Sequence, residues 1–273
     1  MHKILISVFD TEEAAYQGLS ALKDLHRDGD ITLYSSAVIA KDADGSPSVR
    51  QMADRGPIGT LAGVVAGGLV GLLGGPAGVA VGAYVGGVGG LMVDLFNAGI
   101  GDDLVDEVTA TLTPGKAAVV ADVDESWVTP VETRFEPLGA TTFRRLPGDV
   151  IDEELAREAE AMSTELQELR DELRTATGQA KAKVEAAIER QRRRLAALVE
   201  RAEAAVKQEQ ADFEARLATL NAQRQSASER QRARIDARID ELKANHSARR
   251  AKLHEARDLA ARSMDLTREA LVP

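Results

Sequence analysis

A stretch of 36 residues, from Ile58 to Val93, contains no Asp, Glu, Lys, Arg or His. Within it, glycine recurs at every fourth position in two series. The first series is Gly59, Gly63, Gly67, Gly71 and Gly75, and the second is Gly78, Gly82, Gly86 and Gly90. Residues four apart lie on the same side of an α-helix. The pattern therefore predicts two helices, each with a stripe of bare backbone against which another helix can pack closely.

Gly74, Gly75 and Pro76 separate the two glycine series. Proline removes a backbone donor and clashes with the preceding helical turn, so these residues predict the turn of a helical hairpin. In water, each glycine costs a helix about 1 kcal/mol relative to alanine, and only close packing offsets that cost. Lipid favours such packing, because backbone groups must bond internally there and small residues let helices approach. The stretch is therefore interpreted as a glycine-zipper hairpin suited to an apolar environment.

Three arrangements of this hairpin fit the sequence. Its halves, at 58–75 and 77–93, are close to the minimum length that crosses a hydrocarbon core of about 30 Å. The hairpin forms two short transmembrane helices, or inserts only part-way into the bilayer, or packs between the subunits of a soluble oligomer. We favour the transmembrane arrangement, in which both ends lie on one side. Arg50 and Arg55 precede the hairpin and favour the cytoplasmic side.

The sequence around the hairpin predicts one small α/β domain at residues 1–146, with the insertion at 57–97. Strand-like runs lie at 3–9, 31–40, 117–123 and 140–144, and helical patterns lie at 10–27, 102–112 and 128–138. Asp44, Gly45 and Pro47 predict a turn. The order of elements is that of a ferredoxin-like sandwich, with helices on one face of one sheet. The predicted fold class is therefore α+β.

Residues 149–272 predict a helical tail, because this segment contains one glycine, Gly178, and no proline. Its apolar residues follow the 4-3 spacing of a coiled coil. The predicted seam consists of Leu166, Leu169, Leu173, Leu195, Val199, Val206, Ile235, Ile239 and Leu242. One continuous helix would be roughly 185 Å long. Two or three antiparallel helices are more economical than one. Their turns are expected near Gly178 or within 221–229. The tail is expected to form a coiled coil or a helical bundle, or to bind a protein partner.

Composition and motifs argue against an enzyme. The chain has no cysteine, and aromatic residues make up only 3% of it. Residues 1–148 hold 10 basic and 19 acidic residues, which disfavours a nucleic-acid partner. The glycine-rich stretch lacks the G-x-x-x-x-G-K-[ST] motif, and His246 and His254 are too far apart in sequence to share a metal within one helical turn. No catalytic residue, metal or cofactor is therefore expected.

Three segments besides the zipper carry a family resemblance: the strand Ile4-Leu5-Ile6-Ser7-Val8-Phe9, the helix start Asn97-Ala98-Gly99-Ile100-Gly101-Asp102-Asp103, and the strand entry Leu112-Thr113-Pro114-Gly115-Lys116-Ala117-Ala118. Through them, residues 1–145 resemble the bacterial family of predicted membrane proteins catalogued as domain of unknown function twelve-sixty-nine. The resemblance implies a ferredoxin-like domain with a membrane-associated insertion, and it implies no activity. The long tail departs from the short members of the family.

These features together predict a non-enzymatic, membrane-associated assembly or scaffold protein. It is expected at the cytoplasmic membrane, with the α/β domain and the tail on the cytoplasmic side. The expected partners are membrane lipid, further copies of the same chain, and a protein bound through the tail. The alternative is a soluble, stress-related interaction protein of the cytoplasm, a homo-oligomer with the zipper buried between its subunits.

Overall fold

The computed structural model describes residues 2–53, 61–73, 102–146 and 149–270. These residues form two compact units. Unit 1 comprises Met1–Val150 together with Ala215–Leu242, and unit 2 comprises Ile151–Glu214 together with Lys243–Pro273. A stretch from the middle of the tail thus belongs to the same unit as the α/β domain.

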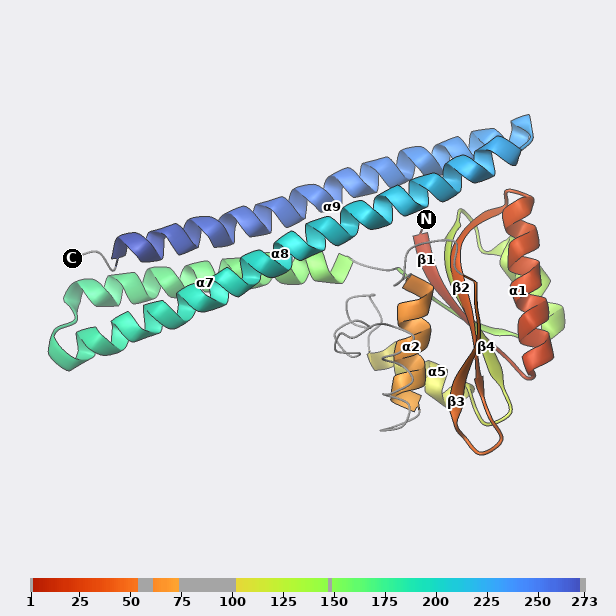
Figure 1. Ribbon diagram of the computed structural model, residues 1–273, viewed down its shortest axis with the longest axis horizontal. Helices are drawn as coiled ribbons and strands as arrows, with labels where there is room; N and C mark the ends of the chain where they lie inside the picture. The colour runs from red at the N-terminus through yellow and green to blue at the C-terminus, as the bar shows by residue number, and fades with distance from the viewer. Residues whose placement is uncertain (1, 54–60, 74–101, 147–148, 271–273) are drawn as a thin grey trace. The chain divides into compact units, whose positions relative to one another are not determined.

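Unit 1 is built on a five-stranded antiparallel sheet with the order β3-β2-β4-β1-β5 (Figure 1). The strands are β1 (His2–Phe9), β2 (Ile31–Lys41), β3 (Pro47–Ala53), β4 (Ala117–Glu125) and β5 (Thr141–Arg145). β4 lies between β1 and β2 and pairs with both, which makes β1-α1-β2 a split βαβ unit. The four predicted strands therefore have the ferredoxin-like arrangement, and the predicted α+β class is confirmed.

The edge strand β3 was not predicted. The predicted turn at Asp44 and Gly45 is present, and Gly45 has a positive φ of 86°. The chain then returns as β3, which pairs with β2 alone. Pro47 starts this strand, where a missing backbone donor is tolerated. An edge strand with polar residues such as Arg50 and Gln51 lacks the continuous apolar run of the central strands.

Helices cover both faces of the sheet, whereas the sequence predicted helices on one face. The helices are α1 (Glu12–Arg27), α6 (Thr129–Phe135) with the short η1 (Glu136–Leu138) on one face, and α2 (Leu61–Leu73) with α5 (Asp102–Thr111) on the other (Figure 1). Successive strand residues enter different cores: Leu5 packs with α1, and Ile4 and Ile6 pack with α2 and α5. Both faces are therefore buried, which explains why the central strands are apolar throughout.

Helix α1 begins at Glu12, two residues after the start of the predicted helical pattern. The hydroxyl of Thr11 caps it by accepting a hydrogen bond from the backbone N–H of Ala14, at 3.1 Å. Thr11 is therefore the capping residue. Further along α1, a Cβ at Gly18 would lie 2.4 Å from Cζ of the buried Phe9, so this position requires glycine for close approach.

Helix α2 is the described part of the predicted zipper hairpin, and it forms part of the core of unit 1. Its sheet-facing side chains are Ala62, Val65, Ala66, Leu69 and Val70, which pack with residues of β1, β2, β4 and α5. The helix is 13 residues long. In the described part of the chain, no helix has the length and apolar character needed to cross a membrane. The predicted hairpin turn and second helix lie outside the described residues.

The tail is helical, as predicted, and consists of α7 (Asp149–Thr175), α8 (Gly178–Ser226) and α9 (Glu229–Ala270). Its two turns lie at Gly178, where φ is +56°, and between Ser226 and Glu229, the two places that the sequence indicated. Within unit 2, α7 and α8 are antiparallel, because Arg194 pairs with Glu165 and Arg201 pairs with Glu158.

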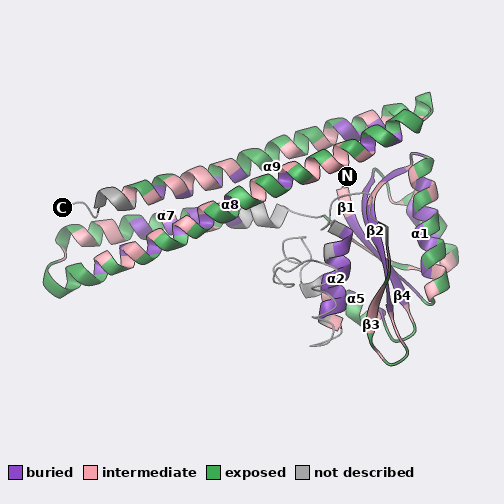
Figure 2. Ribbon diagram, in the orientation of Figure 1, coloured by how far each residue is buried: buried purple, intermediate pink, exposed green. Residues whose placement is uncertain are grey.

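The residues of the predicted coiled-coil seam are buried or partly buried within one chain and are divided between two clusters. The cluster in unit 2 contains Leu166, Leu169, Leu173, Leu195, Val199 and Val206. The cluster in unit 1 contains Ile235, Ile239 and Leu242, together with Leu217, Leu220 and Tyr34 of β2. Buried positions recur along the tail helices between exposed ones (Figure 2). The seam residues at the hairpin end therefore pack against the α/β domain as well as against each other.

Candidate functional site

The most constrained polar region of unit 1 lies where β4 ends, beside the starts of β1 and β2. Asp124 is paired in register with His2 and with Thr32, and Glu125 with Ile31. Three carboxylates of β4 are buried here: Asp122 and Asp124 are 4% exposed, and Glu125 is 0% exposed. Because side chains alternate along a strand, Asp122 and Asp124 face one side of the sheet and Glu125 the other. Buried charges of this kind require partners.

Residues 215–242, the α8–α9 hairpin end, supply part of these partners, and we call their contact with β1, β2 and the α1–β2 turn the tip contact. Arg216 donates to Nδ1 of His2 at 2.8 Å, and Nε2 of His2 bonds Oδ1 of Asp122. Since Nδ1 accepts, Nε2 must carry the proton that it donates to Asp122, which describes a neutral imidazole. The Arg216 guanidinium also lies 5.5 Å from the ring centre of Tyr34, within cation–π range.

The neutral state of His2 agrees with its surroundings. Burial lowers the pKa of His2, and Arg216 lowers it further, while Asp122 and Asp124 act in the opposite direction. The net shift is downward, so the folded chain resists protonation of this imidazole. Protonation would place a second positive charge beside Arg216 in a buried site.

Acidification is expected to weaken the tip contact through His2. The unfolded chain takes up a proton near the ordinary histidine pKa of about 6.5, and the folded chain does so only at lower pH. Stability is therefore full above this pH and falls as the pH drops toward the lowered value. The measurement compares hydrogen exchange of residues 215–242 at neutral and mildly acidic pH. In His2→Gln, this pH dependence should be smaller; an unchanged dependence would exclude His2 as its source.

Gln223 recognises the backbone of the α1–β2 turn. Its amide nitrogen donates to the carbonyl oxygens of His26 at 2.6 Å and Ile31 at 2.8 Å, and its amide oxygen accepts from the hydroxyl of Thr32 at 2.7 Å. Both donors and the acceptor of the amide are thus used, and the side chain is buried. A side chain that satisfies all its polar atoms in this way fixes the position of α8 on the turn.

Arg238 of α9 holds the same turn. Its guanidinium donates to the carbonyl oxygens of Asp30 at 2.6 Å and Gly29 at 3.3 Å, and also lies 3.3 Å from the Thr32 hydroxyl. Arg238 is 2% exposed. Gly29 has a positive φ of 74°, the left-handed conformation that glycine adopts without strain. Two further contacts surround this centre: Arg234 pairs with Asp30 at 2.7 Å, and Gln231 donates to the carbonyl of Asp28 at 2.6 Å.

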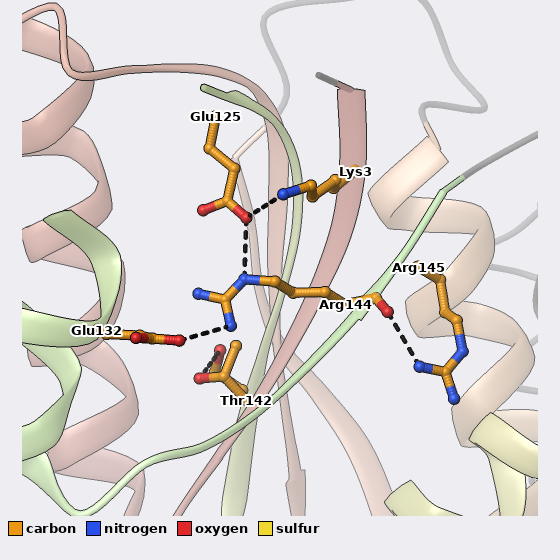
Figure 3. A network of polar contacts seen from close by, with 7 residues as sticks. Lys3, Glu125, Glu132, Thr142, Arg144 and Arg145 are labelled. Carbon is orange, nitrogen blue, oxygen red and sulfur yellow. Dashed lines mark hydrogen bonds and ion pairs between the residues drawn. The ribbon is translucent and has the colours of Figure 1, made fainter. Parts of the chain in front are cut away.

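A second polar network occupies the other side of the sheet end (Figure 3). The Glu125 carboxylate pairs with Lys3 at 3.0 Å and with Nε of Arg144 at 2.9 Å. Arg144 also reaches Glu132 of α6 at 3.3 Å. Nearby, the hydroxyls of Ser7 and Thr142 are hydrogen-bonded at 3.0 Å. This network joins β1, β4, β5 and α6, so it stabilises the sheet rather than the tip contact.

These charged groups are engaged with one another. Across the described ranges, no group of three or more His, Asp or Glu side chains is arranged to hold a metal ion. The arrangement is that of a joint between segments almost 200 residues apart in sequence, such as Thr32 and Gln223. These polar contacts make docking of the α8–α9 hairpin specific, because each polar atom requires a particular partner.

The sequence analysis did not identify the tip contact. Its only local signal is a gap in the seam: no large apolar residue occurs across 221–234, where the 4-3 pattern breaks. Gln223 and Arg224 lie in that gap, and Gln223 is buried although it is polar. A break in an apolar seam of a long helix therefore marked a place where the helix meets something other than its neighbouring helix.

The structure describes three of the predicted zipper glycines. Gly63, Gly67 and Gly71 lie in α2, and all three are buried. At 100° per residue, they lie about 90–170° around the helix from the side that packs on the sheet. The other predicted zipper positions, Gly59, Gly75, Gly78, Gly82, Gly86 and Gly90, and the turn residues Gly74 and Pro76, lie outside the described residues.

Residues 60–169 match the sequence profile of the family described as "Protein of unknown function (DUF1269)". The predicted family resemblance is confirmed over this segment. It begins in the insertion, includes α2, α5, β4, α6 and β5, and extends into α7. No curated protein and no solved structure matches the chain. The comparison therefore identifies a family without assigning it a reaction.

Proposed function

We propose that the chain is a non-enzymatic, membrane-associated scaffold that self-associates through its glycine-zipper insertion. This proposal rests on the position of the α2 glycines, which lie on a different side of the helix from the side chains that pack on the sheet. The apolar side chains of α2 already pack on the sheet, and Gly63, Gly67 and Gly71 lie away from that contact. Glycines are unfavourable in a helix unless another backbone approaches closely. Their four-residue spacing supports such an approach by a second helix.

Membrane association is supported by the length of uncharged sequence beyond α2. Residues 74–93 are 20 consecutive residues without a charged side chain, which supports insertion part-way into the bilayer, because the helices on either side, α2 and α5, pack in the same core. Both ends of the insertion return to the same α/β domain, so this domain and the tail are proposed to lie together on the cytoplasmic side. In this proposal, the partners are membrane lipid and a second copy of the chain.

The tail has a different role in this scaffold. Its predicted seam residues already pack within one chain, buried or partly buried, so this packing would have to open before they could form a coiled coil with another copy. A protein partner would therefore bind the outer surface of the tail. We propose that residues 215–242 of the tail are fastened to the α/β domain through the tip contact.

Gly67→Ala is expected to disrupt self-association. If a second helix approaches this stripe, an added methyl group prevents the approach and the oligomer dissociates. Gly67 is buried within the single chain, so if only residues of the same chain cover this stripe, the oligomer mass should stay unchanged. The oligomer mass in detergent, measured by size-exclusion chromatography with light scattering, distinguishes the two results.

Gly68→Ala is the matched control for this experiment. Gly68 belongs to the same helix and is also buried, but it lies outside the four-residue series. The control should leave the oligomer unchanged. Equal effects of the two substitutions would argue against a zipper, because they would report general crowding around α2 instead of one packing stripe.

The soluble alternative is favoured by one observation, the inclusion of α2 in the core of unit 1. In that case the protein is a cytoplasmic homo-oligomer with the zipper buried between subunits. Fractionation of cells without detergent separates the two functions. Recovery of the full chain in the membrane pellet, resistant to high salt, supports the membrane scaffold. A soluble oligomer of defined mass supports the alternative.

A further inference from the structure

One side of α8 in unit 2 carries a row of exposed basic residues, which we call the basic face. It consists of Lys183, Arg190, Arg193, Arg194 and Arg201, all of them exposed. At 3.6 residues per turn, these positions lie within about a third of the helix circumference, along roughly 27 Å of its length. The side of α8 facing the opposite way carries the buried Ile188 and Leu195. The basic residues therefore point away from the helical core.

The basic face keeps most of its charge available. In the described part of the chain, Lys183, Arg190 and Arg193 form no ion pair or hydrogen bond through their side chains. Arg194 and Arg201 pair with Glu165 and Glu158 of α7, but their side chains are 57% and 54% exposed. Exposed pairs of this kind contribute little and exchange readily.

The positions between the basic residues are small. Ala186, Ala197 and Ala204 lie in the same sector of α8 and are exposed, and between residues 183 and 204 no acidic residue occupies that sector. Nothing therefore projects beyond the guanidinium and ammonium groups. A row of cations on a straight, flat surface is complementary to phosphates that lie in one plane, as in the headgroup layer of a membrane.

We propose that the basic face of α8 docks on anionic phospholipid headgroups. Arginine donors bind phosphate oxygens in bidentate fashion, which suits four of the five exposed positions. Nucleic acid is less suitable, because the face has no aromatic residue for base stacking and its neighbour α7 carries 10 acidic and 3 basic residues. A membrane plane touches only the basic side, whereas a flexible polyanion would also meet the acidic one. The proposal rests on the proposed membrane association.

The test uses the full chain with one fluorescent label. The natural sequence has no cysteine, so Ala186→Cys creates a single labelling site on the basic face. Energy transfer from this label to an acceptor lipid in vesicles reports contact of α8 with the surface. Strong transfer is expected with vesicles containing phosphatidylglycerol, and weak transfer with pure phosphatidylcholine. Salt should reduce the signal, since the interaction is screened over about 10 Å at 0.1 M ionic strength.

Replacing Arg190 and Arg193 by glutamine should weaken this contact. Each basic residue near an anionic membrane contributes about five-fold to partitioning, so the pair should account for roughly a 25-fold loss. Arg170→Gln with Arg174→Gln is the matched control, because it removes the same charge from α7. The control should leave the energy transfer within about two-fold of the natural chain.

The outcomes separate the docking proposal from the proposed function. If the chain floats with vesicles of either composition and the label shows no transfer, the insertion attaches the chain and the basic face does not dock. That result overturns the docking proposal alone. If the chain floats with neither composition, both proposals fail. An oligonucleotide is also added in the absence of vesicles. If it changes the fluorescence of the label, and replacing Arg190 and Arg193 by glutamine abolishes that change, the basic face binds nucleic acid and the lipid proposal is wrong.

Discussion

Arg238→Ala is expected to weaken the tip contact by about 3–5 kcal/mol, the loss typical when one partner of a buried charged network is removed. The substitution takes donors away from the buried carbonyl oxygens of Gly29 and Asp30. It also removes a positive charge that interacts electrostatically with the buried Asp124. The expected result is rapid hydrogen exchange across residues 215–242, while the central strands keep their protection.

Arg234→Ala is the matched control for Arg238→Ala. Arg234 lies one helical turn away and pairs with Asp30, but its side chain is 38% exposed and that of Asp30 is 33% exposed. Its removal should cost less than about 1 kcal/mol, because water replaces much of the lost interaction. If both substitutions have the same small effect, the tip contact depends on its apolar residues, such as Leu220 and Ile235, and not on the buried guanidinium.

Glu125→Gln should lower the free energy of unfolding of the whole α/β domain by about 3 kcal/mol. Glu125 is 0% exposed and neutralises both Lys3 and Arg144, whose side chains are only 18% and 19% exposed. Glutamine has nearly the same shape, so the loss would come from charge and not from a cavity. Urea unfolding followed by the fluorescence of Trp127, the single tryptophan, measures this change.

Two further variants test whether the loss of stability in Glu125→Gln comes from its buried ion pair with Arg144. Glu132→Gln removes the other carboxylate that contacts Arg144, but Glu132 is 56% exposed, and less than about 1 kcal/mol should be lost. In the double variant Glu125→Gln with Arg144→Gln, part of the stability should return, because an uncompensated buried cation is gone. Additive losses in the double variant would show that the two residues do not interact energetically.

The sheet and the tail helices illustrate what local pattern predicts well. The central strands are continuous apolar runs because both of their faces are covered, and such runs are visible in the sequence. Gly178 marks the first turn of the tail because it adopts a positive φ there. Edge strand β3 was missed because an edge strand with polar residues such as Arg50 resembles a loop in sequence.

In the charge-free stretch, residues 58–93, local pattern does not determine which apolar surface the helix packs against. Its lack of charge and its glycine period correctly predicted a helix, which is present as α2. The same features suit a lipid, a second helix or a protein core equally well, because each is an apolar environment. Only the tertiary structure assigned one side of α2 to the sheet, through residues such as Val65 and Leu69.

By itself, the sequence determined the helical and extended segments other than β3, the order of the predicted α/β elements and the turns of the tail. These follow from contacts between residues a few positions apart, where periodicity and turn residues are decisive. The tertiary structure decided which surfaces meet. Gln223 and Arg238 recognise the turn around Gly29 and Thr32 across almost 200 residues or more of intervening chain. A polar side chain in a helix has no local property that distinguishes such a contact from exposure to solvent, so only the folded chain could reveal it.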